Sequence, residues 1–149
     1  MTSTPDPSFA DRTYPPGPAH DISAAKIAEF ARATSAPSPL HTDPAAAREA
    51  GYADVIAPPT FLVSLAQATE AQYIQDPAAG IDFTRVVHGE EGFTLHRPVV
   101  AGDRLIPTLT VESVRAAGGH AMVTTRVDMA DEDGAAVASV KSMLVIRGE

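Results

Sequence analysis

Histidine is the residue type in this chain whose ordinary pKa suits proton transfer near neutral pH, and the chain has five of them. There is no cysteine, which excludes thiolate nucleophiles, cysteine metal sites and disulfide bonds. The histidines lack the spacing of metal ligands, and the sequence has no phosphate-binding loop, nucleophile elbow or dinucleotide fingerprint. We therefore expect no metal and no cofactor. General acid–base catalysis and ligand binding remain as the available chemistry.

His41 is the histidine best placed for such a role, because it ends a proline-rich crossing. Pro37 and Pro39 forbid helix continuation and favour an extended chain over whatever lies beneath. A contact with a ligand and a packed or surface position are both compatible with His41. His88, on a strand candidate, could meet a substrate from beside a helix, although a structural or exposed histidine is the simpler interpretation.

Helices must hold this crossing in place. Five prolines within residues 1–19 favour an extended or disordered start, so we expect a flexible arm over 1–13 and a single domain over 14–149. An amphipathic helix is predicted over 22–34, after Asp21 as N-cap. Asp43-Pro44 starts a second, short helix. Residues 60–73 carry so little charge that we expect a third helix, buried nearly all round.

The C-terminal half predicts the sheet that this third helix needs. Short strand candidates occupy 85–88 and 90–97, and long ones occupy 103–115, 120–130 and 135–147. Gly118-Gly119 and the run 131–134 are hairpin turn signals, which predict an antiparallel meander of the last three strands. Long strands can curl strongly, so the expected fold is α+β, with a curved antiparallel sheet around a long central helix.

Charge narrows the classes of partner. The formal net charge of −8 disfavours nucleic acid and anionic membranes, and favours a small metabolite or another protein. No apolar run approaches 18 residues and no basic-then-apolar leader is present, so we expect a cytoplasmic protein. Arginine suits phosphate binding, but ordinary solvated strand faces explain the arginines equally well; the candidates are Arg85, Arg97, Arg104 and Arg126.

Three segments resemble a known family. Ser-Ala-Pro-Ser-Pro-Leu-His at 35–41 resembles the signature Gly-Asp-x-Asn-Pro-aliphatic-His of the MaoC-like R-specific enoyl-thioester hydratases and 3-hydroxyacyl dehydratases. Residues 93–105 are similar to the segment that precedes the first long strand in that family, and 54–61 is similar to the start of its central helix. The resemblance implies a hot-dog fold that works as a dimer, with an acyl tunnel between the subunits.

The resemblance also implies two departures at the catalytic site. In the family, an Asp and a His five residues apart hold the water that adds to the enoyl double bond; His41 matches the His, but Ala36 replaces the Asp. A Gly N–H at the helix start donates to the thioester carbonyl in the family, whereas Pro59 stands here and proline has no N–H. The substrate-binding residues that the resemblance implies are Ala57, Pro59, Thr60, Phe61, Leu65 and His88.

These departures suggest the substrate-binding half of a (3R)-hydroxyacyl-thioester dehydratase or trans-2-enoyl-thioester hydratase in fatty acid metabolism. The resemblance is to accessory dehydratase subunits of actinobacteria. The implied ligand is an acyl thioester of coenzyme A or acyl carrier protein, and the implied assembly is a homodimer or a heterodimer with a catalytic hot-dog subunit. Two alternatives stay open: a self-sufficient homodimer in which Glu90 or His88 assists His41, and a non-catalytic acyl-thioester binder.

Overall fold

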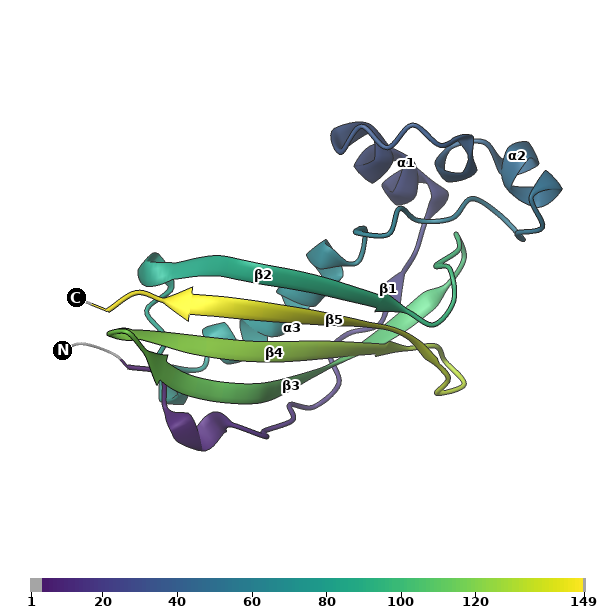
Figure 1. Cartoon of the computed structure of the whole chain (residues 1–149). Helices are drawn as coiled ribbons and strands as arrows, with labels where there is room; N and C mark the ends of the chain where they lie inside the picture. The colour runs from purple at the N-terminus through teal and green to yellow at the C-terminus, as the bar shows by residue number, and fades with distance from the viewer. Residues whose placement is uncertain (1–3, 149) are drawn as a thin grey trace.

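A five-stranded antiparallel sheet forms the body of the chain, in a computed structural model that describes residues 4–148 (Figure 1). The strand order is β1-β3-β4-β5-β2, so the last three strands form a meander and β2 returns to pair with β5. Their bounds are β1 His20–Asp21, β2 Val86–Leu95, β3 Arg104–Ala117, β4 His120–Ala130 and β5 Ala136–Ile146. The predicted meander is confirmed. The two short candidates over 85–97 are instead one strand.

A bulge at Gly89 explains why β2 looked like two strands. The pairing of β2 with β5 shifts between His88 and Glu90, because Gly89 is an extra residue opposite the partner strand. A Cβ on Gly89 would lie 2.6 Å from the end of the Met143 side chain, so a larger residue there would require that side chain to move. The bulge turns His88 and Glu91 toward the same face of the sheet: their partners, Leu144 and Ser142, are both buried.

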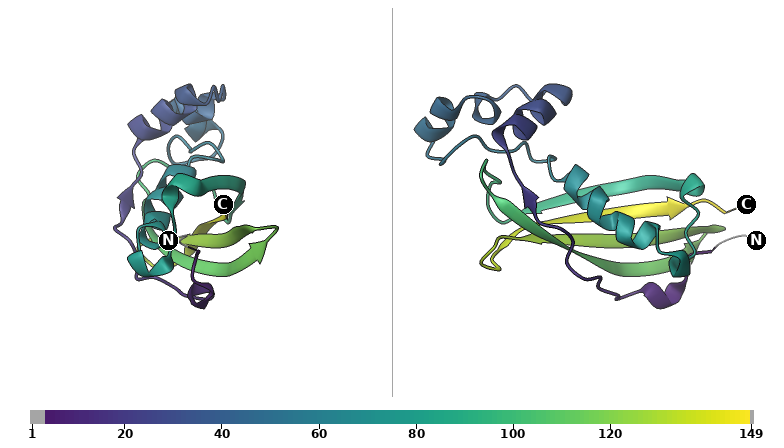
Figure 2. Two further views of the ribbon diagram at one scale, coloured as in Figure 1. Left: turned by 90° about the vertical axis from the view of Figure 1, so that its left-hand side faces the viewer. Right: turned by 180° about the vertical axis from the view of Figure 1, so that it is seen from behind.

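The long helix α3, Val63–Ile74, lies along the concave face of the sheet (Figures 1 and 2). The buried residues of this helix are Ala66, Thr69, Glu70 and Tyr73, and Leu62 just before it is also buried. The expectation that this helix is buried nearly all round is wrong, because Ser64, Gln67 and Ala68 are exposed. The helix also begins later than predicted, since the turn around Pro58 and Pro59 precedes it.

The helices before α3 project beyond one end of the sheet (Figure 2). They are α1 Ala24–Ala33, the 3-10 turn η2 Pro39–His41 and α2 Pro44–Glu49. Asp43 caps α2 as predicted, through its carboxylate and the Ala45 N–H. The N-cap of α1 is Ser23 rather than the expected Asp21, which belongs to β1. We refer to residues 22–62 as the overhang.

The first residues pack against the sheet, which corrects the expectation of a flexible arm over 1–13 for its described part. The 3-10 turn η1, Pro7–Phe9, inserts Phe9 into the core, where 2% of the residue is exposed. Its ring centroid lies 5.9 Å from that of Tyr73 on α3. The Asp11 N–H donates to the Val111 carbonyl at 2.8 Å, so this segment lies along β3. Residues 1–3 lie outside the described part.

Two further 3-10 turns join α3 to β2: η3 Pro77–Ala79 and η4 Phe83–Arg85. Between residues 4 and 148, no helix combines the length and the apolar character that crossing a membrane requires.

Candidate functional site

His41 is held at the end of η2 by a single strong contact. Its Nδ1 lies 2.7 Å from the Ile56 carbonyl oxygen, and because that oxygen can only accept, Nδ1 carries the proton. In the neutral ring Nε2 is then left as the acceptor or base. The residue is 8% exposed. The Ser38 hydroxyl accepts from the Leu40 N–H at 3.3 Å and so caps the turn that carries the histidine.

The positions beside His41 lack groups that transfer protons or donate to a carbonyl. Ala36 offers only a methyl group, and its N–H donates to the Ala31 carbonyl at 2.8 Å. The Ala57 N–H is also used, since it donates to the Val99 carbonyl at 2.8 Å. Pro58 and Pro59 have no N–H to offer at the turn that leads into α3. The assignment of His41 and Ala36 to the family's acid–base positions stays a prediction.

The remaining expected site residues divide into two groups. Thr60 and Pro59 are exposed at the overhang, and Leu65 is half-buried on α3. Phe61 is 4% exposed and packs edge-on against Phe30 of α1, with ring centroids 5.5 Å apart. This contact joins α1 to the start of α3. Their roles toward a substrate stay predictions.

His88 and His41 of the same chain lie far apart and cannot form one site. His88 and Leu95 are seven residues apart on β2, which spans about 23 Å of extended strand. The chain then reaches the overhang beyond Leu95, where Val99 contacts Ala57. His88 and its neighbour Glu90 therefore lie toward the opposite end of the molecule from His41.

A buried polar cluster beneath α3 escaped sequence reasoning. Glu70 on α3 is 2% exposed, and its Oε1 accepts a hydrogen bond from the Thr125 hydroxyl at 2.7 Å. Both carboxylate oxygens of Glu91 on β2 are buried without a hydrogen-bond partner among the described residues. Glu91 pairs with Ser142, and Ser142 pairs with Thr125, so the three form one row across β2, β5 and β4. Two features of the sequence could have indicated this cluster: a glycine within a strand pattern, Gly89, and a glutamate on an otherwise apolar helix, Glu70.

Burial raises the pKa of ionisable groups on and beside α3, among them Glu70, Tyr14 and Tyr73. Desolvation raises the pKa of Glu70, and the nearby Glu91 raises it further, while the Thr125 hydrogen bond and His88 oppose the shift. The pKa of Tyr14 is raised to about 12, mainly by desolvation and by its hydrogen bond to Asp76. Glu70 is thus the carboxyl of this fold whose neutral form is favoured by its surroundings.

The arginines suggested for phosphate binding are mostly committed to carboxylates. Arg97 pairs with Asp103 at 2.7 Å. Arg104 pairs with Asp21 at 2.8 Å, and Arg126 pairs with Glu112 at 2.6 Å. Solvated ion pairs, rather than phosphate contacts, account for these three side chains.

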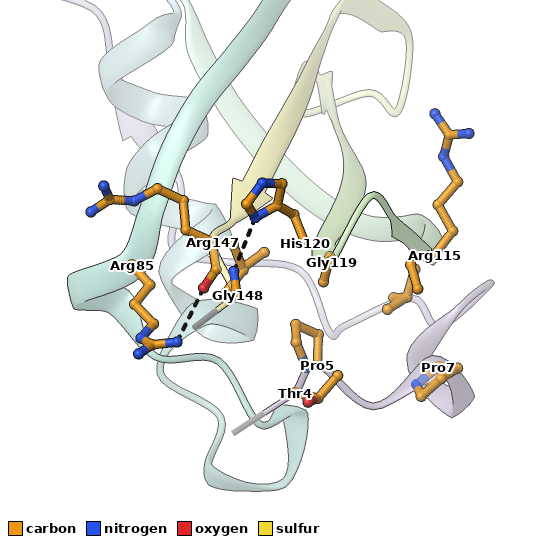
Figure 3. A pocket seen from close by; sticks show the side chains of 13 residues that line it. Thr4, Pro5, Pro7, Arg85, Arg115, Gly119, His120, Arg147 and Gly148 are labelled. Atoms are coloured by element: carbon orange, nitrogen blue, oxygen red, sulfur yellow. Dashed lines mark hydrogen bonds between the residues drawn. The ribbon is translucent and has the colours of Figure 1, made fainter. Parts of the chain in front are cut away.

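Another set of basic side chains lies at the end of the sheet opposite the overhang. A pocket of about 350 Å³ is lined there by the N-terminal segment, the β3–β4 hairpin and the C-terminal residues (Figure 3). Its basic residues are Arg85, Arg115, His120 and Arg147. Figure 3 shows Arg115 and Arg147 pointing to opposite sides, while the His120 Nδ1 accepts from the Gly148 N–H at 3.1 Å. These groups form a basic rim and not a convergent anion site.

Comparison with known sequences gives a consistent result over nearly the whole chain. A family model described as "FAS1-like, dehydratase domain region" matches residues 13–140. A protein named UPF0336 protein from Saccharopolyspora erythraea is 47% identical over 143 residues, which cover 96% of this chain and 92% of that protein.

Solved structures agree with the sequence match. A protein described as a MaoC-like dehydratase superposes with a TM-score of 0.88 at 28% identity, covering 95% of this chain; this chain spans 43% of that protein's length. The C-terminally truncated HadBC (3R-hydroxyacyl-ACP dehydratase) complex from Mycobacterium tuberculosis gives a TM-score of 0.83 at 27% identity, covering 92% of this chain and 96% of that one. The expected hot-dog fold is confirmed.

Proposed function

This chain belongs to the family described as the FAS1-like dehydratase domain region, among MaoC-like hot-dog proteins, and on that premise we propose that it is the substrate-binding subunit of a (3R)-hydroxyacyl-thioester dehydratase. The same subunit serves the reverse hydration of trans-2-enoyl thioesters. A second hot-dog chain supplies the general acid and base. The ligand is an acyl thioester of coenzyme A or acyl carrier protein.

The observation that carries this proposal is the state of the overhang. His41 is fixed by the Ile56 carbonyl at 2.7 Å, but Ala36 stands where the family's carboxylate is expected. Pro59 removes an amide donor that would stabilise the developing oxyanion, and one such donor contributes about 100- to 1000-fold in rate. A chain with both losses keeps the shape of the site and the His41 imidazole, but lacks the carboxylate partner and one amide donor.

A free sheet edge supports a partner chain. β2 is the edge strand beside β5, whereas β3 at the other side is covered by β1 and by the N-terminal segment. The exposed large apolar side chains of residues 4–148 are Phe83, Val87 and Leu95, all on β2 or just before it. An unpaired strand edge flanked by apolar side chains is a surface for adding another strand. We expect β2 of a second hot-dog chain to pair there.

The uncovered side of α3 supports the same geometry. Ser64, Gln67 and Ala68 are exposed on the single chain, and Gln67 lines a groove together with His88 of β2. A second chain paired along β2 would cover this side with its own central helix, which leaves room for an acyl chain between the two. Leu65 of α3 and Thr60 of the overhang then face the ligand from this subunit, and His41 orders the overhang.

A self-sufficient homodimer is the second candidate. His88 and Glu90 are too far from His41 to assist it within one chain, so this candidate requires those groups from the partner subunit. A non-catalytic acyl-thioester binder is the third, and it differs by binding saturably without turnover in any partnership.

Activity measurements separate the three. The chain is assayed for hydration of a short trans-2-enoyl thioester alone and after co-expression with a hot-dog chain that carries the complete Asp/His signature. The proposal expects at least a 100-fold higher rate for the pair than for either chain alone. Turnover by this chain alone that is lost in His41→Ala would support the homodimer instead. Saturable binding without turnover in either preparation would support the binder.

A further inference from the structure

A groove opens over the buried polar cluster, between α3 and the start of β2. Its volume is about 370 Å³, which falls within the range of small-molecule sites. The walls combine apolar side chains with amides; the lining residues are Gln67, Glu70, Ala71, Ile74, Gln75, Phe83 and His88. Glu70 is the one buried ionisable residue among them. The groove therefore has mostly apolar walls and a carboxyl in its floor.

The floor is built by three strands and a helix. The bulge at Gly89 directs both His88 and Glu91 toward α3, which a regular strand could not do for residues three apart. Thr125 fixes one oxygen of Glu70 through the 2.7 Å hydrogen bond to Oε1. No hydrogen bond among residues 4–148 engages the other oxygen, Oε2, and Glu70 lines the groove. One oxygen is thus positioned and the other is available to a ligand.

Burial is the main cause of the raised pKa of Glu70, and the charged groups around it act in addition. Glu91 and His88, both from β2, are the titratable groups that act on it, while Thr125 from β4 and Ser142 from β5 are uncharged. Two carboxylates in one buried site do not both ionise readily. Glu91 therefore acts as a positioning residue that adds to the effect of burial in favouring the protonated form of Glu70, and a protonated carboxyl is a hydrogen-bond donor.

We propose that this groove binds an acyl chain that carries an uncharged acceptor oxygen, such as a keto group, and that this oxygen accepts a hydrogen bond from the carboxyl of Glu70. The choice of an acyl chain rests on the proposed function. A plain alkyl chain at the same depth would cover Glu70 without offering it a hydrogen-bond acceptor, which disfavours that ligand. Glu70 is thereby a specificity-determining residue that selects oxygenated chains over plain ones.

Binding of matched probes to the full chain tests this inference. The probes are S-decanoyl-N-acetylcysteamine and a series of its analogues with one keto group at successive carbons from C5 to C9, measured by calorimetry. At mildly acidic pH, we expect one or two neighbouring keto positions to bind about fivefold to tenfold more tightly than the plain chain, the size of one net hydrogen bond. The preference should fall as pH rises and Glu70 ionises, because a carboxylate only accepts.

Three variants assign the preference to Glu70. Glu70→Leu should abolish it, whereas Glu70→Gln, which keeps a donor that does not titrate, should retain it at every pH. Glu91→Gln should move the loss of preference to lower pH, since it removes the charge that keeps Glu70 protonated; a merely structural role for Glu91 would not shift this profile. Glu49→Gln, on the exposed side of α2, is the matched control and should change nothing.

Equal binding of the plain and keto probes would overturn this inference while leaving the proposed acyl-thioester function intact. A keto preference that survives in Glu70→Leu would overturn it too. Absence of binding by every probe would also overturn it, and the activity of the reconstituted pair would then decide separately whether the proposed function stands.

Discussion

Phe9→Ala tests how the N-terminal segment anchors the central helix. The Phe9 residue is 2% exposed, and its ring lies 5.9 Å from the Tyr73 ring of α3, centroid to centroid. The Arg12 guanidinium lies 3.6 Å from the centroid of the Phe9 ring, a cation–π contact that the variant also loses. Tyr73 is one turn after Glu70, so this anchor holds the part of α3 that carries the polar cluster.

The expected loss follows from burial. Truncating a buried Phe to Ala costs about 3–5 kcal/mol of unfolding free energy, and we expect the lower end, about 3 kcal/mol, because a terminal segment can partly collapse into the space. For a chain of this size that corresponds to a fall in Tm of roughly 6–12 °C. Circular dichroism melts and urea titrations of the isolated chain measure both quantities.

Phe83→Ala is the matched control, because Phe83 is 68% exposed on the single chain. At low protein concentration its effect should stay within about 0.5 kcal/mol. A loss below about 1 kcal/mol for Phe9→Ala, or equal losses for the two variants, would refute the conclusion that the first residues belong to the core.

Three other perturbations probe the rest of the molecule. Because the pKa of Glu70 is raised, the folded chain holds a proton on Glu70 that the unfolded chain releases at the same pH. The free energy of unfolding should therefore fall as pH rises from the ordinary glutamate pKa through the folded pKa. Glu70→Gln should flatten this slope, which thermal melts at stepped pH measure. Gly80→Ala should lower the free energy of unfolding by about 2 kcal/mol, because φ at this position is +71° and the new Cβ would lie 2.7 Å from the Thr4 carbonyl oxygen. Urea titration measures this loss, and an unchanged urea midpoint would contradict the prediction. Val87→Arg should weaken association with a partner chain at least tenfold in sedimentation experiments without altering the circular dichroism spectrum, whereas unchanged association would place the interface elsewhere.

Local chemistry made several elements predictable from the sequence. Gly118 and Gly119 adopt positive φ of 58° and 80°, which is why the Gly-Gly pair correctly marked the β3–β4 hairpin. Asp43 followed by Pro44 marked a helix start for an equally local reason. The hot-dog fold followed from resemblance combined with the order of these elements.

Features that depend on register or on distant packing were not predictable. Gly89 looked like a break between strands, because a bulge and a turn share the same residue preference. Glutamates are normally exposed, so nothing local identified Glu70 and Glu91 as neighbours beneath a helix. Phe9 lies in a proline-rich run whose composition suggests disorder, and only its packing against Tyr73 reveals a core position.

The isolated chain's turnover of a short trans-2-enoyl thioester is the most direct measurement of the central claim. That claim is that this hot-dog domain shapes a substrate site but lacks the carboxylate of the acid–base pair and one amide donor. The expected result is a rate near the uncatalysed background for the chain alone, and robust hydration once a chain with the full Asp/His signature is present. Rapid hydration by the purified chain alone, unchanged by added partner, would contradict the claim.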